Sequence, residues 1–192
     1  PLGDGCCATD EECDDGNACT VNSCSAVNEC EVNAAFDESC CPESGVVFQT
    51  DFESSISFSI SNSVPAGGWQ LSQSQSKSSS NSLWYGSEQT GNLDFGPSSG
   101  TATSTSILLP DSFTLTLKFW VWSDVFAPLD VLILLADGTP ELIWKEIPPV
   151  QGAWTEIQVD LSPWKSQLVQ LRFAFSSNGA PLSGVYLDDI SI

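Results

Sequence analysis

The sequence predicts an all-β protein, an antiparallel sandwich or barrel that follows a small module held together by disulfide bonds. Apolar and polar residues alternate in several segments after residue 46, which is the period of a strand with one buried face. Turn-forming pairs such as Asn178-Gly179 separate these segments. All eight cysteines lie between Cys6 and Cys41 of the 192-residue chain, so we expect two domains, residues 1–45 and 46–192.

The first domain carries 11 acidic side chains, no lysine or arginine and few apolar residues. A module of this size without a core needs disulfide bonds or a metal. The spacings contain no CxxC pair, which disfavours a zinc site. We therefore expect about four disulfides, formed in an oxidising compartment, with the pairing left open. The cysteines are Cys6, Cys7, Cys13, Cys19, Cys24, Cys30, Cys40 and Cys41.

The clearest strand of the second domain is predicted at residues 113–122, where Phe113, Leu115, Leu117, Phe119 and Val121 form one face. The same alternation marks residues 157–161 and 169–175, and the apolar run 129–135 is typical of a central strand. No segment has a convincing helical pattern, although residues 162–167 suit a single turn. The Ser/Gln-rich residues 72–82 are predicted to form a loop.

The composition excludes several classes of function. With 25 acidic and 5 basic residues, the chain has a formal charge of −20, which would repel nucleic acid. The absence of histidine removes the usual general base and most hydrolase triads. No run approaches the roughly 18 apolar residues of a membrane-spanning helix. An apolar content of 41% nevertheless predicts a folded protein, and we expect one that is not an enzyme.

Three segments of the second domain stand out as motifs: residues 46–53 (VVFQTDFE), 152–162 (GAWTEIQVDLS) and 184–190 (GVYLDDI). Together they resemble the MAM-like jelly-roll domains of bacterial secreted proteins. Likewise, residues 13–20 (CDDGNACT), together with Cys24 and Cys30, resemble the cysteine-rich repeats of large myxobacterial surface proteins. The resemblance to MAM-like domains implies an antiparallel jelly-roll β-sandwich used for adhesion, carbohydrate binding or assembly, without catalysis. Animal MAM domains have cysteines in the sandwich, whereas residues 46–192 contain none.

The resemblance also implies a structural Ca²⁺ where the first strand of the sandwich meets the last. The matching residues are Asp51, Glu53, Asp188 and Asp189. Calcium takes six to eight oxygen ligands, and Asp51 and Glu53 would project from the same face if both lie on one strand. The alternative is that these acids are solvated at an edge, or that one of them pairs with Arg172 or a backbone amide.

A second candidate calcium site lies in the cysteine-rich module. It contains Asp10, Asp14, Asp15 and Asn17, but these residues lack the order of an EF-hand loop. The alternative is a solvated turn, because Asp-Asp-Gly-Asn is good turn-forming sequence by itself.

A third candidate is an aromatic ligand surface. Trp120 and Trp122 are predicted to lie on the face opposite the core stripe of residues 113–121. Gln170 and Arg172 occupy the outward face of a later strand. The four side chains are expected to form one platform, where sugar rings stack on indole while the amide and guanidinium bind hydroxyl groups. A protein contact, or cover by a loop, by the cysteine module or by another subunit, is the alternative.

We therefore expect a secreted or cell-surface bacterial protein, non-enzymatic and structural or adhesive, stabilised by disulfides and Ca²⁺. It would self-associate into a fibre or surface layer, or bind another surface protein. The first and last strands of the sandwich, placed at the chain ends, would be free to pair with a neighbour. The alternatives are a carbohydrate-binding module and an accessory domain of a secreted enzyme.

Overall fold

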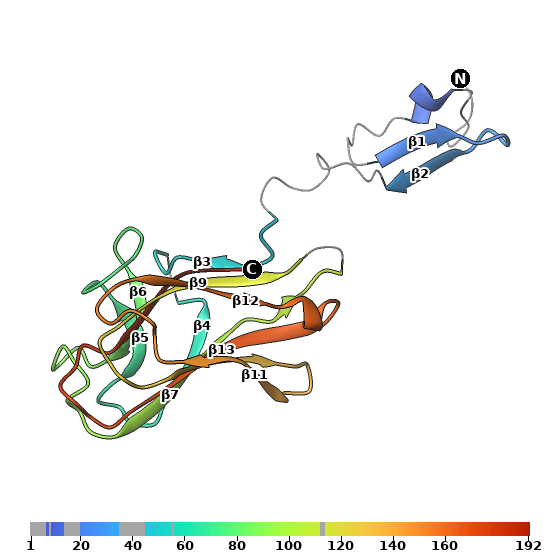
Figure 1. The fold of residues 1–192 in the computed structure, drawn as a ribbon. Helices are drawn as coiled ribbons and strands as arrows, with labels where there is room; N and C mark the ends of the chain where they lie inside the picture. The colour runs from blue at the N-terminus through green and yellow to red at the C-terminus, as the bar shows by residue number, and fades with distance from the viewer. Residues whose placement is uncertain (1–6, 8, 14–19, 35–44, 55, 112–113) are drawn as a thin grey trace. The chain divides into compact units, whose positions relative to one another are not determined.

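A computed structural model describes residues 7, 9–13, 20–34, 45–54, 56–111 and 114–192. The chain divides into two compact units, Pro1–Gly45 and Val46–Ile192, which are described separately below (Figure 1). Within the described residues, no helix has both the length and the apolar character that membrane crossing requires.

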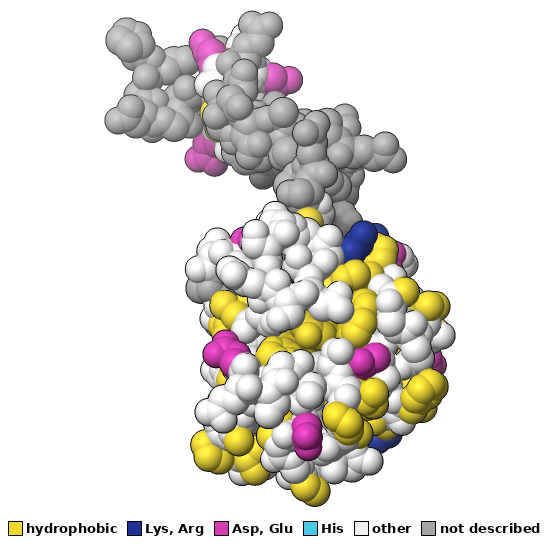
Figure 2. Space-filling view, turned by 90° about the vertical axis from the view of Figure 1, so that its left-hand side faces the viewer, with side chains coloured by type: hydrophobic (Ala, Val, Ile, Leu, Met, Phe, Trp, Pro, Cys, Tyr) yellow, Lys and Arg dark blue, Asp and Glu magenta, His cyan; other side chains and the backbone are white. Residues whose placement is uncertain are grey.

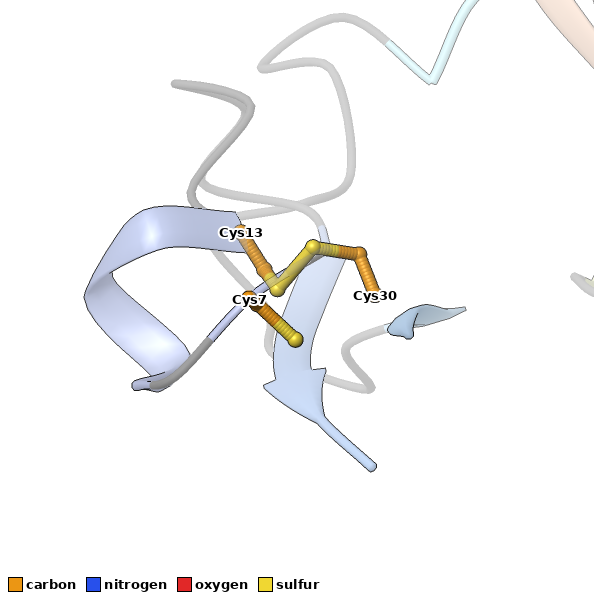
Figure 3. A group of neighbouring side chains, drawn as sticks. All are labelled: Cys7, Cys13 and Cys30. Atoms are coloured by element: carbon orange, nitrogen blue, oxygen red, sulfur yellow. A yellow bond between two sulfur atoms is a disulfide. The ribbon is translucent and has the colours of Figure 1, made fainter. Parts of the chain in front are cut away.

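The first unit is a short 3-10 turn, η1 (Asp10–Cys13), next to an antiparallel hairpin of β1 (Thr20–Cys24) and β2 (Cys30–Ala34). Disulfide Cys13–Cys30 joins the end of η1 to the hairpin, and Cys7–Cys24 joins the hairpin to Cys7, three residues before η1. Figure 3 shows the Cys13–Cys30 bond beside Cys7. Each disulfide restricts the unfolded chain, which contributes about 3 kcal/mol to stability. The prediction of disulfides is confirmed for these four cysteines; Cys6, Cys19, Cys40 and Cys41 lie outside the described residues.

The second unit consists of two antiparallel sheets. The order of the first sheet is β11 (Pro140–Glu146), β10 (Leu129–Leu134), β13 (Leu168–Ser177), β7 (Ser98–Ser104) and β4 (Phe58–Asn62), and β8 (Ile107–Leu108) also pairs with β13. The order of the second sheet is β12 (Thr155–Asp160), β9 (Thr116–Ser123), β14 (Val185–Ser191), β6 (Ser82–Gly86) and β5 (Gly68–Ser72), and β3 (Gln49–Thr50) also pairs with β14. The predicted antiparallel sandwich is confirmed.

Local predictions for the second unit also hold. Residues 129–135 contain β10, which lies between β11 and β13. The expected single turn is η3 (Ser162–Trp164), a 3-10 turn with Pro163 in its first positions. Residues 73–81 form the loop between β5 and β6.

The core lies between the sheets and is built by the predicted alternation. Phe119 of β9 and Phe173 of β13 are both fully buried. Their rings meet across the sheets edge to face, with centroids 5.4 Å apart, a geometry that aromatic pairs prefer. Phe113, the first residue of the predicted stripe, lies outside the described residues.

The expectation that the last strand is free to pair with a neighbour is wrong. β14 lies between β9 and β6, and β3 pairs with its end through Ile190 and Thr50. The edge strands of the second sheet are β12 and β5. On β12, the exposed acids Glu156 and Asp160 disfavour pairing with another chain.

Substitution of a core phenylalanine tests this packing. Phe119→Ala should lower the free energy of unfolding by about 3–5 kcal/mol, because it leaves a cavity between the sheets. Phe126 lies in the β9–β10 loop and is 78% exposed, so Phe126→Ala should change it by less than about 0.5 kcal/mol. Urea unfolding followed by tryptophan fluorescence measures both, and equal losses would contradict the assigned core.

Candidate functional site

A buried carboxylate on the outer face of the second sheet anchors the β5–β6 loop. Asp188 is fully buried on β14. Its Oδ2 accepts hydrogen bonds from the amides of Lys77, at 2.7 Å, and Ser78, at 3.1 Å, while Oδ1 accepts one from the Asp189 amide at 2.8 Å. Burial raises the pKa of Asp188, and the three amide hydrogen bonds lower it in part. The loop is therefore fixed to the sheet by a largely dehydrated acid.

Two more of the acids predicted to bind calcium contact the same loop. Glu53 Oε1 accepts hydrogen bonds from the amides of Ser80, at 2.9 Å, and Asn81, at 2.7 Å. Asp189 accepts one from the Ser78 hydroxyl at 2.7 Å. Glu53, from the segment between β3 and β4, and Asp188 and Asp189 of β14 thus meet at residues 77–81.

Asp51 is placed differently. It accepts a hydrogen bond from the Glu53 amide and lines, with Asp189, a hollow of about 520 Å³ beside β3 and β14. Strand β3 ends at Thr50, and Phe52, with a φ of 60°, turns the chain so that its ring is buried. The expectation that Asp51 and Glu53 project from one strand face is therefore wrong.

These acids suit a hard cation in type but are not gathered into one set. Among the described residues, the only group of three or more possible metal-binding side chains within 4.8 Å of one another is Cys7, Cys13 and Cys30, which form disulfides. Glu53 and Asp188 already bind backbone amides, which was one of the alternatives. Their remaining lone pairs, with Asp189 and the hydroxyl of Ser78, are oxygen ligands that Ca²⁺ accepts.

The second candidate calcium site is described only at Asp10. Its carboxylate accepts a hydrogen bond from the Cys24 amide at 2.7 Å, which ties η1 to β1. Asp14, Asp15 and Asn17 lie outside the described residues, so this site stays a prediction.

Trp122 belongs to a small aromatic cluster instead of an open platform. On the outer face of the second sheet, Trp122, Tyr186 and Trp84 are neighbours across β9, β14 and β6. Tyr186 stacks on Trp84 with an interplanar angle of 13° and meets Trp122 edge to face. The Trp84 indole lies against Gly86, where an added Cβ atom would be 2.0 Å from the ring. Partly buried Trp154 packs against the cluster, and the exposed fraction of Trp122 is only 8%.

The predicted platform is wrong as a single surface. Trp120 and Trp122 lie on β9 of the second sheet, whereas Gln170 and Arg172 lie on β13 of the first. Because the inner faces form the core, the two outer faces point in opposite directions. Loop cover, one of the alternatives, applies to Trp120, whose ring lies 4.2 Å from the Lys77 ammonium.

Gln170 and Arg172, the other two residues of the predicted platform, form hydrogen bonds to the neighbouring strand β7. Gln170 donates a hydrogen bond to the Ser104 carbonyl at 2.8 Å, and the Arg172 Nε donates one to the Thr103 hydroxyl at 3.0 Å. Both side chains are partly buried.

Two features of the outer face were not predicted. Asp124 accepts hydrogen bonds from the amides of Ser183 and Gly184, which fixes the loop before β14. Two hollows of about 490 and 550 Å³ lie alongside β5, and Glu88 lines both of them. Apart from Glu88 and a few apolar residues, their lining consists of serine, glutamine, asparagine and glycine, which in the sequence indicate only loops.

No family model matches the chain. A stretch of 103 residues is 27% identical to the pre-pro-metalloprotease PrtV of Vibrio cholerae serotype O1, in strains M66-2 and El Tor Inaba N16961. The match covers 46% of this chain and 11% of the protease.

Solved structures show the same fold. The K1 and K3 cleaved adhesin domains of Lys-gingipain from Porphyromonas gingivalis W83 match with a TM-score of 0.55 and 15% identity. The matches cover 75% and 76% of this chain and 95% and 97% of those domains. TmCBM61 in complex with β-1,4-galactotriose matches with a TM-score of 0.50 and 11% identity, over 73% of this chain and 88% of that one. The chain thus shares its fold with adhesin domains and carbohydrate-binding modules.

Ionisation of the two tyrosines of the chain tests how deeply they are buried. Tyr186 belongs to the aromatic cluster on the outer face, and Tyr85 belongs to the core. Burial, together with the charge of Asp124, raises the pKa of Tyr186 to about 12, and burial also raises the pKa of Tyr85. The neutral form is therefore favoured in the folded state, so stability should fall as pH rises from 10 toward 12. In a Tyr85→Phe variant, the absorbance of tyrosinate should stay low at pH 10 and rise near pH 12 or on unfolding. Ionisation near pH 10 in the folded variant would contradict the burial of Tyr186.

Proposed function

We propose that this chain is a non-catalytic extracellular attachment module, which holds a larger protein or further copies of itself to a surface. The role of Asp188 carries the non-catalytic part of the proposal. A buried carboxylate with a raised pKa is what a general acid requires, yet this one is bound by three backbone amides. Its position serves to fix a loop, and the chain contains no histidine to act beside it.

The compartment and the kind of ligand have separate support. Two disulfides close the described part of the first unit, which favours an oxidising environment. The likeness to adhesin domains and to a galactotriose-bound module supports attachment, with a glycan as the second candidate ligand. The partial similarity to a Vibrio protease favours a further alternative, an accessory segment of a secreted enzyme.

Attachment can be measured on the purified full chain. We expect saturable retention on insoluble polysaccharide or on bacterial cells, without turnover of any added substrate. Light scattering during size-exclusion chromatography reports self-association over the same concentrations. A protein that stays monomeric and is retained on none of these surfaces would contradict attachment, and turnover of a substrate would contradict the non-catalytic role.

We further propose that Ca²⁺ binds where Glu53, Asp188 and Asp189 meet the loop 77–81. A cation would relieve the repulsion between the carboxylates of Asp188 and Asp189, because none of the three acids forms a salt bridge in the described structure. A calcium-loaded protein should lose several degrees of melting temperature in chelator, equivalent to about 1–2 kcal/mol.

The shift in melting temperature should be absent in Asp188→Asn and smaller in Glu53→Gln. It should persist in the matched variant Glu156→Gln, which removes an exposed acid from β12. Differential scanning calorimetry measures all four proteins. An unchanged melting curve of the unmodified protein in chelator would count against the site.

A further inference from the structure

Two neighbouring hollows lie along β5 and share Glu88 in their lining; together they are named here the β5 groove. One lies between the β4–β5 turn and residues 87–89, and the other between residues 71–74 and Trp84. Glu88 lines both, so the groove follows the strand from Gly68 to Ser72. At about 3.3 Å per residue, this is the length of a short oligosaccharide.

The walls of the groove are fixed by hydrogen bonds. The Asn62 amide binds both backbone groups of Trp69, donating to its oxygen at 3.2 Å and accepting from its nitrogen at 2.9 Å. Gly68 makes this contact possible, because its φ is 141° and a Cβ atom would lie 2.2 Å from the Asn62 side chain. Gln70 donates to the Gly86 carbonyl at 2.9 Å. A ligand would therefore meet a preformed surface.

Side chains around the groove carry amide and hydroxyl groups. Among them are Gln70, Gln73, Gln89, Asn81, Ser72 and Ser74. Each amide offers a donor and an acceptor side by side, which matches two adjacent hydroxyl groups on a sugar ring. Trp84 lies beneath the second hollow but is only 2% exposed, so it supports the surface without offering a stacking face.

Charge narrows the class of ligand. Glu88 is the only charged side chain among the described residues that line the two hollows. Figure 2 shows one face of the sandwich, where acidic side chains are isolated among uncharged and apolar ones. A single acid without a basic partner repels uronic or sulfated sugars and leaves neutral sugars unaffected.

We propose that the β5 groove binds a short stretch of neutral glycan through its amide and hydroxyl groups. The inference rests on the proposed attachment function and names the ligand class and the surface that would serve it. Binding by hydrogen bonds without aromatic stacking suits a module that gains strength from several copies at one surface.

Blocking variants test the site. Ala66 and Ser74 are exposed and line the first and second hollows respectively, so Ala66→Trp and Ser74→Trp should obstruct the groove while leaving the fold intact. Ser59→Trp, at an exposed position of β4 on the first sheet, is the matched control. The probes are an array of neutral glycans, then soluble β-1,4-galactotriose and any further hit, followed by amide chemical shifts and calorimetry.

We expect saturable shifts at Gln70, Glu88 and Gln89, and at least tenfold weaker binding in both blocking variants but not in the control. Glu88→Gln should improve binding of a uronic acid trisaccharide severalfold and leave the neutral ligand unchanged. Binding that maps to the first sheet and is lost in Ser59→Trp would overturn the groove while the attachment function stands. Retention on cells without any neutral glycan hit would overturn the ligand class, and loss of retention altogether would overturn the attachment function itself.

Discussion

The contact between the apolar inner faces of the two sheets is the constraint on which the rest of the sandwich depends. Phe119 and Phe173 meet there edge to face, and the alternate residues Leu117 and Val121 of β9 and Leu171 of β13 are fully buried. Once alternate residues of each strand are committed to this core, the others must face outward. The two outer faces then differ only in what the loops and neighbouring strands place over them.

On the second sheet, that cover is organised around Asp188. Residues 77 and 78 of the β5–β6 loop bind its carboxylate, and residues 73, 74 and 81 of the same loop line the β5 groove. The anchor and the groove are therefore two parts of one loop. A cation that bound at Asp188 and Glu53 would restrict the loop, and it would lower the entropy lost when a ligand occupies the groove.

The sequence predicts which face of a strand is buried better than it predicts what covers the other face. Leu117, Phe119 and Val121 are identified by their period, because burial of one face requires it. The same period places Trp122 outward but cannot show that Tyr186 and Trp84 lie beside it, since strand order depends on contacts far apart in the chain. For the same reason, the period places Gln170 and Arg172 on the outward face of their own strand but cannot show that this strand belongs to the other sheet.

The two acids between β3 and β4 show a second limit of prediction from the sequence. Asp51 and Glu53 have the spacing of one strand face, yet the left-handed turn at Phe52 separates them, and a non-glycine residue in that conformation leaves no signal in the sequence. The sequence does not predict the β5 groove, because its polar lining residues are typical of any loop, and the hydrogen bonds of Asn62 and Gln70 to the backbone depend on the folded chain.

The distribution of charge links these features to attachment. Eleven of the 25 acidic residues lie in the first 45 positions, while the described lining of the β5 groove carries one. Net negative charge keeps a protein soluble and disfavours non-specific contact with anionic polymers. If the groove binds a neutral glycan as proposed, its low charge would leave selectivity to hydrogen bonding, while the acidic residues elsewhere would disfavour contact with anionic polymers.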